Sequence, residues 1–358
     1  MTRTSRVRLA LAAKNLARAV ETNLNRVVGR QLVPPHGGIL HIETSSLCNL
    51  DCRFCAYGKK RSPKVSMAHA LFQTCVEQAV ALGYRRFELT PCTGDVFMDR
   101  HIFDKLDLLE SRADVAGYGF YTNFTVLDAS DVGALVKLRK LDRLTISIYG
   151  HDLDSFKAIT RSTEKVYRRL LENLAALYGP VAEGRLGVSF GLRTSGDAPK
   201  TCGSELERLL ARFREAGCAL RRSKIYSNWG GYISDTDVEG LAIDVVGPGS
   251  TYKNGACALL FTDLQVMATG IVNGCACRDV DATLRIGDLN EAPLAEIISS
   301  RNPAYLALIA EQQAGNFRPV CQSCDFYQSI YRMRTANRRQ GIACTSIAGY
   351  LAALDARA

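Results

Sequence analysis

The sequence predicts an α/β fold built around a parallel sheet, in a chain of 358 residues. Two observations carry this prediction. Past Pro34 and Pro35, strand-like segments alternate with segments whose apolar residues recur at helical spacing. The strand–helix step is repeated six times, which is typical of parallel sheets whose crossovers are helices. Hydrophobic residues make up 47% of the chain, enough for an ordinary buried core.

The expected elements follow one another in a regular order. The six strand candidates are Ile39–Thr44, Arg86–Thr90, Gly117–Thr122, Arg143–Tyr149, Gly187–Arg193 and Leu220–Tyr226. The helical stretches between them include Met67–Leu82, Asp104–Arg112, Thr163–Tyr178 and Ser204–Ala216. Residues 235–255, rich in Gly and Asp, then connect to a second region. There we expect a hairpin made of Asp263–Met267 and Gly270–Val272.

The first 36 residues form a basic extension, in which seven Arg or Lys face a single acid, Glu21. Apolar residues at helical spacing predict an amphipathic helix here: Leu9, Leu16, Val20, Leu24 and Val27. We expect this helix to pack on the outside of the core. Contact with a membrane surface or an acidic partner, and a role as an organellar transit peptide, stay open as alternatives.

Composition excludes several classes of protein. The net charge of +9 is carried mostly by the extension, so the remainder does not indicate a nucleic-acid-binding protein. No run of 18 apolar residues is present, and the N-terminus lacks the pattern of a secretory signal. We therefore expect a cytoplasmic protein whose 13 cysteines serve as thiols or metal ligands rather than disulfides.

Three of these cysteines form a tight motif, C-x3-C-x2-C, made by Cys48, Cys52 and Cys55. A complete structural iron–sulfur cluster normally takes four thiolates, so three would leave one iron open for a ligand. A structural zinc site is the alternative, but the motif has neither paired C-x2-C halves nor a histidine pair nearby.

The motif and the strand that enters it resemble those of the radical S-adenosylmethionine (SAM) enzymes. The resemblance implies a partial (β/α)6 TIM-like barrel over residues 37–235 and a 4Fe–4S cluster that binds SAM. It also implies cleavage of SAM to a 5′-deoxyadenosyl radical, which abstracts hydrogen from a C–H bond. The electron for this cleavage would come from a reductant of flavodoxin or ferredoxin type.

The resemblance also places SAM contacts at the carboxyl ends of the strands. The residues at these positions are Phe54, Tyr57, Thr93, Gly94, Asp95, Asn123, Ser147, Tyr149 and Arg193. Phe54 and Tyr57 would lie near the adenine, and the guanidinium of Arg193 would fork onto the SAM carboxylate. Thr93-Gly94-Asp95 stands where the family has a Gly-Gly-Glu-like motif for the SAM amino group. For each residue, an ordinary hydrogen bond at the barrel mouth is the alternative.

A second set of cysteines lies in the C-terminal third. Cys257 and Cys275 flank the expected hairpin in a C-x12-G-x4-C pattern, and Cys321 and Cys324 follow as C-x2-C. The arrangement resembles the Twitch domain, a shortened SPASM domain. It implies that residues 236–358, ending in a helix, hold one auxiliary 4Fe–4S cluster on four thiolates. Zinc is the alternative occupant. The spare cysteines in this region are Cys277 and Cys344.

The combined pattern resembles radical SAM dehydrogenases of aminocyclitols, the kind that serves butirosin biosynthesis. It implies dehydrogenation of an alcohol in a sugar, aminoglycoside or aminocyclitol, with the auxiliary cluster accepting an electron. One alternative is a sugar epimerase that uses a cysteine hydrogen donor. Cys92, at the end of the second strand, is the candidate donor, unless it is an ordinary buried thiol. A peptide-modifying enzyme, and a non-enzymatic electron carrier or redox regulator, are the further alternatives.

Overall fold

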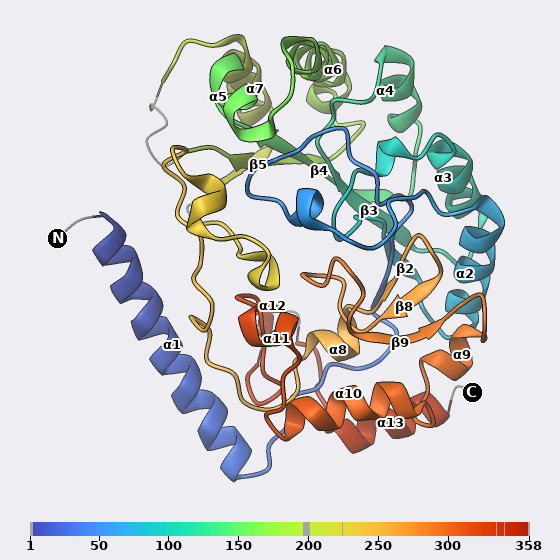
Figure 1. Cartoon of the computed structure of the whole chain (residues 1–358). Helices are drawn as coiled ribbons and strands as arrows, with labels where there is room; N and C mark the ends of the chain where they lie inside the picture. The colour runs from blue at the N-terminus through green and yellow to red at the C-terminus, as the bar shows by residue number, and fades with distance from the viewer. Residues whose placement is uncertain (1–2, 196–200, 224, 334, 340, 357–358) are drawn as a thin grey trace.

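The computed structural model describes residues 3–195, 201–223, 225–333, 335–339 and 341–356. A nine-stranded sheet runs through it in the order β6-β5-β4-β3-β2-β1-β7-β8-β9 (Figure 1). The strands are β1 Ile39–Ile42, β2 Arg86–Glu88, β3 Gly117–Thr122, β4 Leu141–Tyr149, β5 Val188–Arg193, β6 Ala219–Arg222, β7 Gln265–Val266, β8 Ile271–Asn273 and β9 Arg285–Asp288. The first six are parallel, which confirms the predicted α/β class.

Helices cover the outside of this sheet, with α2 to α7 arranged around β1–β6 in Figure 1. The helices are α1 Arg3–Val27, α2 His69–Ala81, α3 Ile102–Ser111, α4 Ala129–Leu135, α5 Leu153–Thr160, α6 Glu164–Ala182, α7 Glu205–Glu215, α8 Leu259–Thr262, α9 Leu294–Ile297, α10 Pro303–Gln313, α11 Pro319–Ser323, α12 Thr335–Arg339 and α13 Ile347–Asp355. The parallel strands thus sit inside a layer of helices, as in a partial TIM-like barrel.

The expected hairpin is present, because β7 pairs antiparallel with β8. It is not separate from the parallel sheet, however. β7 also pairs parallel with β1, so that His41 lies beside Gln265 and Ile42 beside Val266. The strands of the C-terminal third therefore extend the sheet at its β1 edge. This places the end of the hairpin next to the loop that leaves β1.

The two faces of the sheet differ sharply in polarity, since side chains alternate along each strand. One face packs on the helices and is fully buried, with Leu40, Phe120 and Ile146 as examples. The other is polar. Register places His41, Glu88, Gly119 and Arg143 in one row, and Gln265 and Asn273 continue that row across β7 and β8. We call this the polar face. TIM-like barrels usually fill their interior with branched apolar residues, so a polar interior indicates a binding role.

The N-terminal helix lies on the outside of the molecule, and it docks there through its polar side rather than its apolar side. Leu16, Val20, Leu24 and Val27 are 68, 52, 64 and 87% exposed. The opposite side of α1 contacts the rest of the molecule instead, and Thr22 on that side is buried. Polar side chains on this docked side of α1 form hydrogen bonds with the rest of the molecule. Among the described residues, no helix has both the length and the apolarity needed to cross a membrane.

Candidate functional site

The loop that leaves β1 carries the three-cysteine motif and is tied to its surroundings through the backbone. Asp51 N donates to Thr160 O at 3.1 Å and Arg53 N to Ile159 O at 3.0 Å, which fixes the loop on the end of α5. The guanidinium of Arg53 also donates to the carbonyls of Asp237 and Glu239. The cysteines therefore sit on a braced loop rather than a free one.

The three thiols of this loop lie close enough to influence one another's ionisation. Burial raises the pKa of Cys52 well above its usual value, and the charges of Cys55 and Cys48 add to that rise. Burial and the charge of Asp95 raise the pKa of Cys48 to about 12. Such a set is unfavourable as three bare thiolates and becomes favourable around a bound cationic centre. Its chemistry therefore fits an iron–sulfur cluster.

The loop after β2 packs directly on the cysteine loop. Gly94 has φ +133°, and a Cβ there would lie 2.8 Å from Ser45 O and 2.9 Å from Leu47 O. The position thus requires glycine, whereas the buried hydroxyl of its neighbour Thr93 finds no hydrogen-bond partner among the residues that the structure describes. Asp95 N donates to Leu47 O at 2.7 Å.

The carboxylate of Asp95 is engaged by the protein itself. It accepts from Phe97 N at 3.1 Å, from Thr122 Oγ1 at 3.0 Å and from Asn123 N at 2.6 Å. Burial nevertheless raises the pKa of Asp95 to about 6. In this structure Asp95 therefore joins the ends of β2 and β3. A contact between this carboxylate and the SAM amino group, as predicted, would be made in addition to these three hydrogen bonds.

The end of β3 reaches the first cysteine. Asn123 Nδ2 donates to Asn49 Oδ1 at 2.9 Å and lies 3.8 Å from Cys48 Sγ. Ser147, farther along the same edge on β4, is buried. Two of the predicted SAM contacts therefore lie at the same edge of the sheet as the cysteine loop.

Aromatic residues from separate elements gather around Phe54. Its ring lies 5.8 Å from that of Tyr149 and 4.8 Å from that of Tyr226, and the guanidinium of Arg193 stands 6.0 Å above it. Burial raises the pKa of Cys52 and of Cys55, and the positive charge of Arg193 opposes that rise at both thiols. Tyr226 was missed at the sequence level because no motif marks it.

Tyr57 forms a cation–π contact with Lys64, whose Nζ lies 4.0 Å from the centre of the Tyr57 ring. Of the two residues predicted to lie near the adenine, Phe54 is the one whose ring contacts Tyr149 and Arg193.

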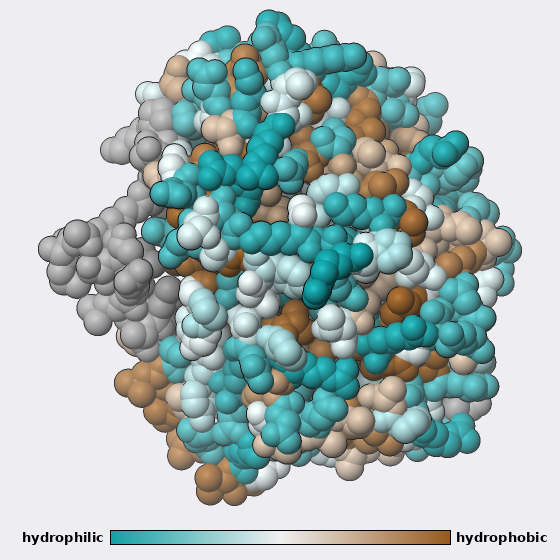
Figure 2. Space-filling view, viewed as in Figure 1, coloured by the Kyte–Doolittle hydropathy of each residue, from teal (hydrophilic) through white to brown (hydrophobic). Residues whose placement is uncertain are grey.

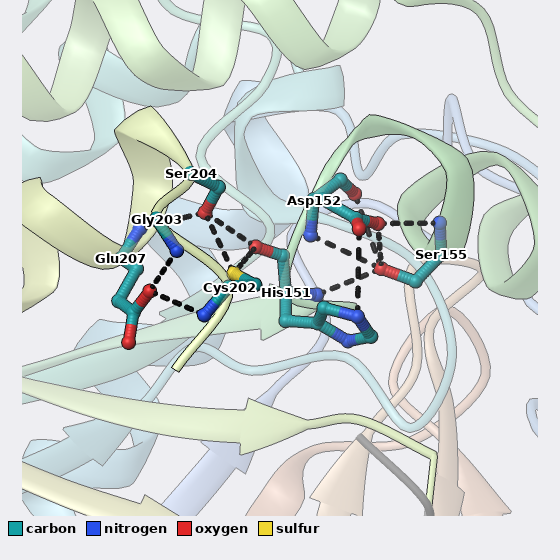
Figure 3. A network of polar contacts seen from close by, with 7 residues as sticks. All are labelled: His151, Asp152, Ser155, Cys202, Gly203, Ser204 and Glu207. Atoms are coloured by element: carbon teal, nitrogen blue, oxygen red, sulfur yellow. Dashed lines mark hydrogen bonds and ion pairs between the residues drawn. The ribbon is translucent and has the colours of Figure 1, made fainter. Parts of the chain in front are cut away.

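Polar contacts brace the loop that follows β4 (Figure 3). Ser204 Oγ donates to His151 O at 2.7 Å, and Asp152 caps α5 by accepting from Ser155 N at 2.9 Å. The thiol of Cys202 also donates to His151 O, at 3.5 Å. This network holds the starts of α5 and α7 together and fixes the backbone just beyond Tyr149. Cys202 thus behaves as an ordinary loop thiol.

The four cysteines of the C-terminal third converge from three separate segments. Burial is the main cause of the raised pKa of Cys257, and the charges of Cys324 and Cys321 contribute. The pKa of Cys275 is raised by burial and by the charges of Cys277, Cys257 and Cys324. Gln312 bridges two of the segments, accepting from Cys257 N at 2.8 Å and donating to Cys321 Sγ at 3.4 Å.

Of the spare thiols, Cys344 contacts Met333 Sδ at 3.8 Å, away from this set. Within the described part of the chain, no three Cys, His, Asp or Glu side chains gather as closely as a single metal ion requires. A cubane sets a different demand, because each thiolate binds a different iron. The donor set of Cys257, Cys275, Cys321 and Cys324 therefore suits a four-thiolate cluster.

One segment joins the two groups of cysteines. Residues 277–281 follow Cys275 and lie against the end of the cysteine loop: Lys60 Nζ donates to Val280 O at 2.8 Å, and Asp281 Oδ1 accepts from Arg61 N at 2.8 Å and from Ser62 N at 2.9 Å. We call residues 277–281 the bridging segment. It connects the candidate auxiliary site to the barrel mouth.

Arg278, in the bridging segment, is a site residue that sequence reasoning missed. Its guanidinium lies 5.1 Å from the Trp229 ring and 4.9 Å from the Phe326 ring, and its Nε is 3.9 Å from Asp325. Burial raises the pKa of Cys55 and of Cys324, and the positive charge of Arg278 opposes that rise in both groups of cysteines. The signal in the sequence was an Arg directly after Cys275-Ala-Cys277.

Cys92 lies where the second strand predicts, at the barrel mouth. It is 5% exposed and packs with Ala56 and Val280, beside Trp229 and Tyr232. Burial raises its pKa well above the usual value, and the charge of Glu43 adds to the rise. The thiol is therefore neutral at ordinary pH.

Glu43, immediately after β1, is the second missed residue. It is 2% exposed; its Oε1 accepts from Ala268 N at 3.4 Å, and its Oε2 has no hydrogen-bond partner among the described residues. Burial raises its pKa, against the lowering effect of Lys60. A buried carboxylate with an open oxygen at the mouth of a barrel is a candidate base.

The first prediction concerns Arg193. Replacing it by alanine is expected to weaken SAM binding by about 1.5–3 kcal/mol, the usual worth of a charge-assisted hydrogen bond. Equilibrium dialysis of the reconstituted protein would measure this. Arg222→Ala on the adjacent strand, where Arg222 donates to Ser195 O, is the matched control and should leave affinity unchanged. Equal SAM affinity in both variants would show that Arg193 does not contact SAM.

Comparison with known families finds two matches. The radical SAM superfamily model matches residues 42–192, and SPASM, an iron-sulfur cluster-binding domain, matches residues 257–325. A sequence comparison with curated proteins finds no match.

Solved structures share the fold. BtrN in complex with AdoMet and 2-DOIA is 15% identical, with a TM-score of 0.53 over 82% of this chain and 94% of that one. Streptococcus suis SuiB bound to precursor peptide SuiA is 14% identical, with a TM-score of 0.53 over 89% and 75%. AnSMEcpe with bound AdoMet is 13% identical, with a TM-score of 0.52 over 90% and 98%. At these identities the likeness is one of fold.

Proposed function

This chain is a radical SAM enzyme with a SPASM-type iron–sulfur domain, and we propose that it oxidises an alcohol carbon of a hydroxylated small molecule. The substrate would be of sugar, aminoglycoside or aminocyclitol type. SAM, a 4Fe–4S cluster and a further iron–sulfur cluster are the cofactors that these domains imply. When bound, they supply a hydrogen-abstracting 5′-deoxyadenosyl radical and an acceptor for one electron.

We assign the cofactor ligands from the thiol groupings. Cys48, Cys52 and Cys55 would hold the first cluster, with Arg193 and the aromatic residues around Phe54 beside bound SAM. The four converging thiols of the C-terminal third would hold the second. An electron donor of flavodoxin or ferredoxin type would serve the first cluster.

The observation that carries the proposal is the bridging segment. It begins two residues beyond Cys275 and ends on the cysteine loop, with Cys92 and Val280 in contact at the barrel mouth. A substrate held at this mouth would lie between the two groups of cysteines. Such a position suits a reaction that loses a hydrogen atom on one side and an electron on the other.

The polar face supports a hydroxylated substrate. Tyr121 on this face is 38% exposed and the side chain of Arg143 is 46% exposed, so solvent reaches the interior. Several acceptor oxygens there are buried without a hydrogen-bond partner in the described structure, among them Glu43 Oε2, Gln265 Oε1 and Asn273 Oδ1. Buried acceptors left unpaired cost about 1–3 kcal/mol each. A ligand that offers O–H or N–H donors would satisfy them.

Glu43 is the residue we propose as the base. In the dehydrogenation, the carbon-bound hydrogen leaves as an atom, the hydroxyl hydrogen leaves as a proton, and one electron passes to the acceptor. The carbon–oxygen bond becomes a double bond, so the product is lighter by two hydrogens. The open Oε2 of Glu43 can take the proton, and nearby Lys60 would stabilise the carboxylate before transfer.

The test of this function combines product mass with one variant. Reduced, reconstituted protein is incubated with SAM and candidate polyols, and 5′-deoxyadenosine and product are followed by mass spectrometry. We expect a product lighter by two hydrogens. Glu43→Gln should keep 5′-deoxyadenosine formation but lower product about 10²–10⁴-fold, the usual worth of a general base.

A structural role for Glu43 would lower both readouts together, so their ratio distinguishes the two roles. Glu43→Asp, which keeps the carboxylate, should restore part of the product. A product of unchanged mass would argue against dehydrogenation.

Epimerisation is the second candidate function, and Cys92 favours it. A hydrogen-atom donor has to be a neutral thiol close to the substrate, and Cys92 is neutral, buried and at the barrel mouth. In that reaction the substrate radical would regain a hydrogen atom on its other face, and product mass would not change.

A further inference from the structure

The first helix presents its apolar side to solvent. Four large apolar side chains spaced by three or four residues lie on one side of α1, and each is more than half exposed: Leu16, Val20, Leu24 and Val27. Positions with this spacing share one face of a helix. Figure 2 shows hydrophobic side chains at the lower left, where Figure 1 places the C-terminal half of α1. We call these four residues the outer stripe.

Polar contacts hold α1 on the body from the other side. Asn15 Oδ1 accepts from Tyr252 N at 2.6 Å, and Asn23 Oδ1 accepts from the hydroxyl of Tyr252 at 2.8 Å. Asn25 Nδ2 donates to Tyr331 O at 2.7 Å. Specific hydrogen bonds therefore set the rotation of the helix. The outer stripe faces away because its opposite side is docked.

Charge indicates what would cover the outer stripe. Residues 1–36 contain seven Arg or Lys, against Glu21 as the single acid. Glu21 is already paired, with Arg332 Nε at 2.8 Å from its Oε2. The positive charge along this segment is therefore not compensated by the segment itself, and an anionic occupant would complement it.

We propose that the outer stripe of α1 binds the surface of an anionic lipid bilayer. A basic helix with one apolar face lies in the plane of such a surface, with its apolar side chains among the acyl chains and its cations near the lipid phosphates. A second copy of the chain fits less well, because pairing two such helices would bring like charges together.

Vesicle co-sedimentation of the full, reconstituted chain tests the proposal. The protein is expected to bind vesicles of phosphatidylcholine mixed with phosphatidylglycerol, to bind pure phosphatidylcholine weakly, and to dissociate as salt is raised. The triple variant Leu16→Gln, Leu24→Gln, Val27→Gln should bind the anionic vesicles at least about tenfold more weakly, because it removes the apolar side chains that would enter the bilayer.

A matched variant separates apolarity from any other change. Leu16→Met, Leu24→Met, Val27→Met keeps the apolar character and should bind like the unmodified chain. Both triple variants change solvent-exposed side chains, so unfolding temperature should stay the same. No binding to anionic vesicles, equal binding by the Gln and unmodified chains, or self-association that only the Gln variant loses would each overturn the proposal.

Discussion

Replacing Cys48, Cys52 and Cys55 together by alanine is expected to abolish SAM cleavage and remove about half of the bound iron. With two 4Fe–4S clusters, the unmodified protein holds about eight irons per chain, and the variant keeps about four. The physical reason is the separation of the ligands. The first three thiols lie on one loop braced by α5, whereas the other four come from three separate segments, two of which are linked by Gln312.

The control removes the same number of thiols elsewhere. Cys75 is buried in α2, Cys202 donates to a backbone carbonyl, and Cys218 is half-buried. Replacing these three by alanine should leave iron content and 5′-deoxyadenosine formation unchanged. Iron and acid-labile sulfide analysis would measure the first quantity, and chromatography the second. About four irons with zinc in the unmodified protein would contradict the assignment of the second cluster.

The strands could be predicted from the sequence because their burial follows short local patterns. β3 agrees with the prediction at both ends, and β5 differs by one residue at its start. The pairing of β7 with β1 could not be predicted, because it joins residues more than 200 positions apart through backbone hydrogen bonds. No side-chain pattern encodes which strand edge is available.

The sequence predicts the part of the candidate site that is marked by the spacing of cysteines along the chain, and no other part. Cysteine spacing predicted seven thiols as cluster ligands, and in the structure these thiols lie in two groups. Glu43 was missed because its importance comes from its buried position beside Cys92. Arg278 was missed because its importance comes from its position between the two groups of cysteines. A single sequence shows neither position. The side through which α1 docks could not be predicted for a related reason. Periodicity identifies an apolar face, but the docking contacts of Asn15 and Asn23 decide where that face points.

The sharpest separation of the two proposed reactions comes from the second group of cysteines. Cys257→Ala or Cys324→Ala is expected to stop product formation while SAM is still cleaved. In a dehydrogenation the substrate radical has to pass one electron to an acceptor, and a cluster that has lost one of four ligands is a damaged acceptor. Mass detection of 5′-deoxyadenosine and of the ketone product would measure the two outcomes separately.

Cys92→Ala is the informative partner of these variants. Cys92 packs with Val280, three residues beyond Cys277, so it lies near the second group without being one of its predicted ligands. For a dehydrogenase, Cys92→Ala should form product at close to the unmodified rate, because the electron leaves through the cluster and no thiol hydrogen is needed.

For an epimerase, Cys92→Ala should still transfer substrate hydrogen to 5′-deoxyadenosine and should lose the inverted product. Deuterium at the abstracted position would report that transfer. We expect the dehydrogenase result, because the proposed four-thiolate cluster would supply an electron acceptor, which of these two reactions only the dehydrogenation requires. Loss of product in Cys92→Ala with hydrogen transfer retained would instead establish the thiol as the donor.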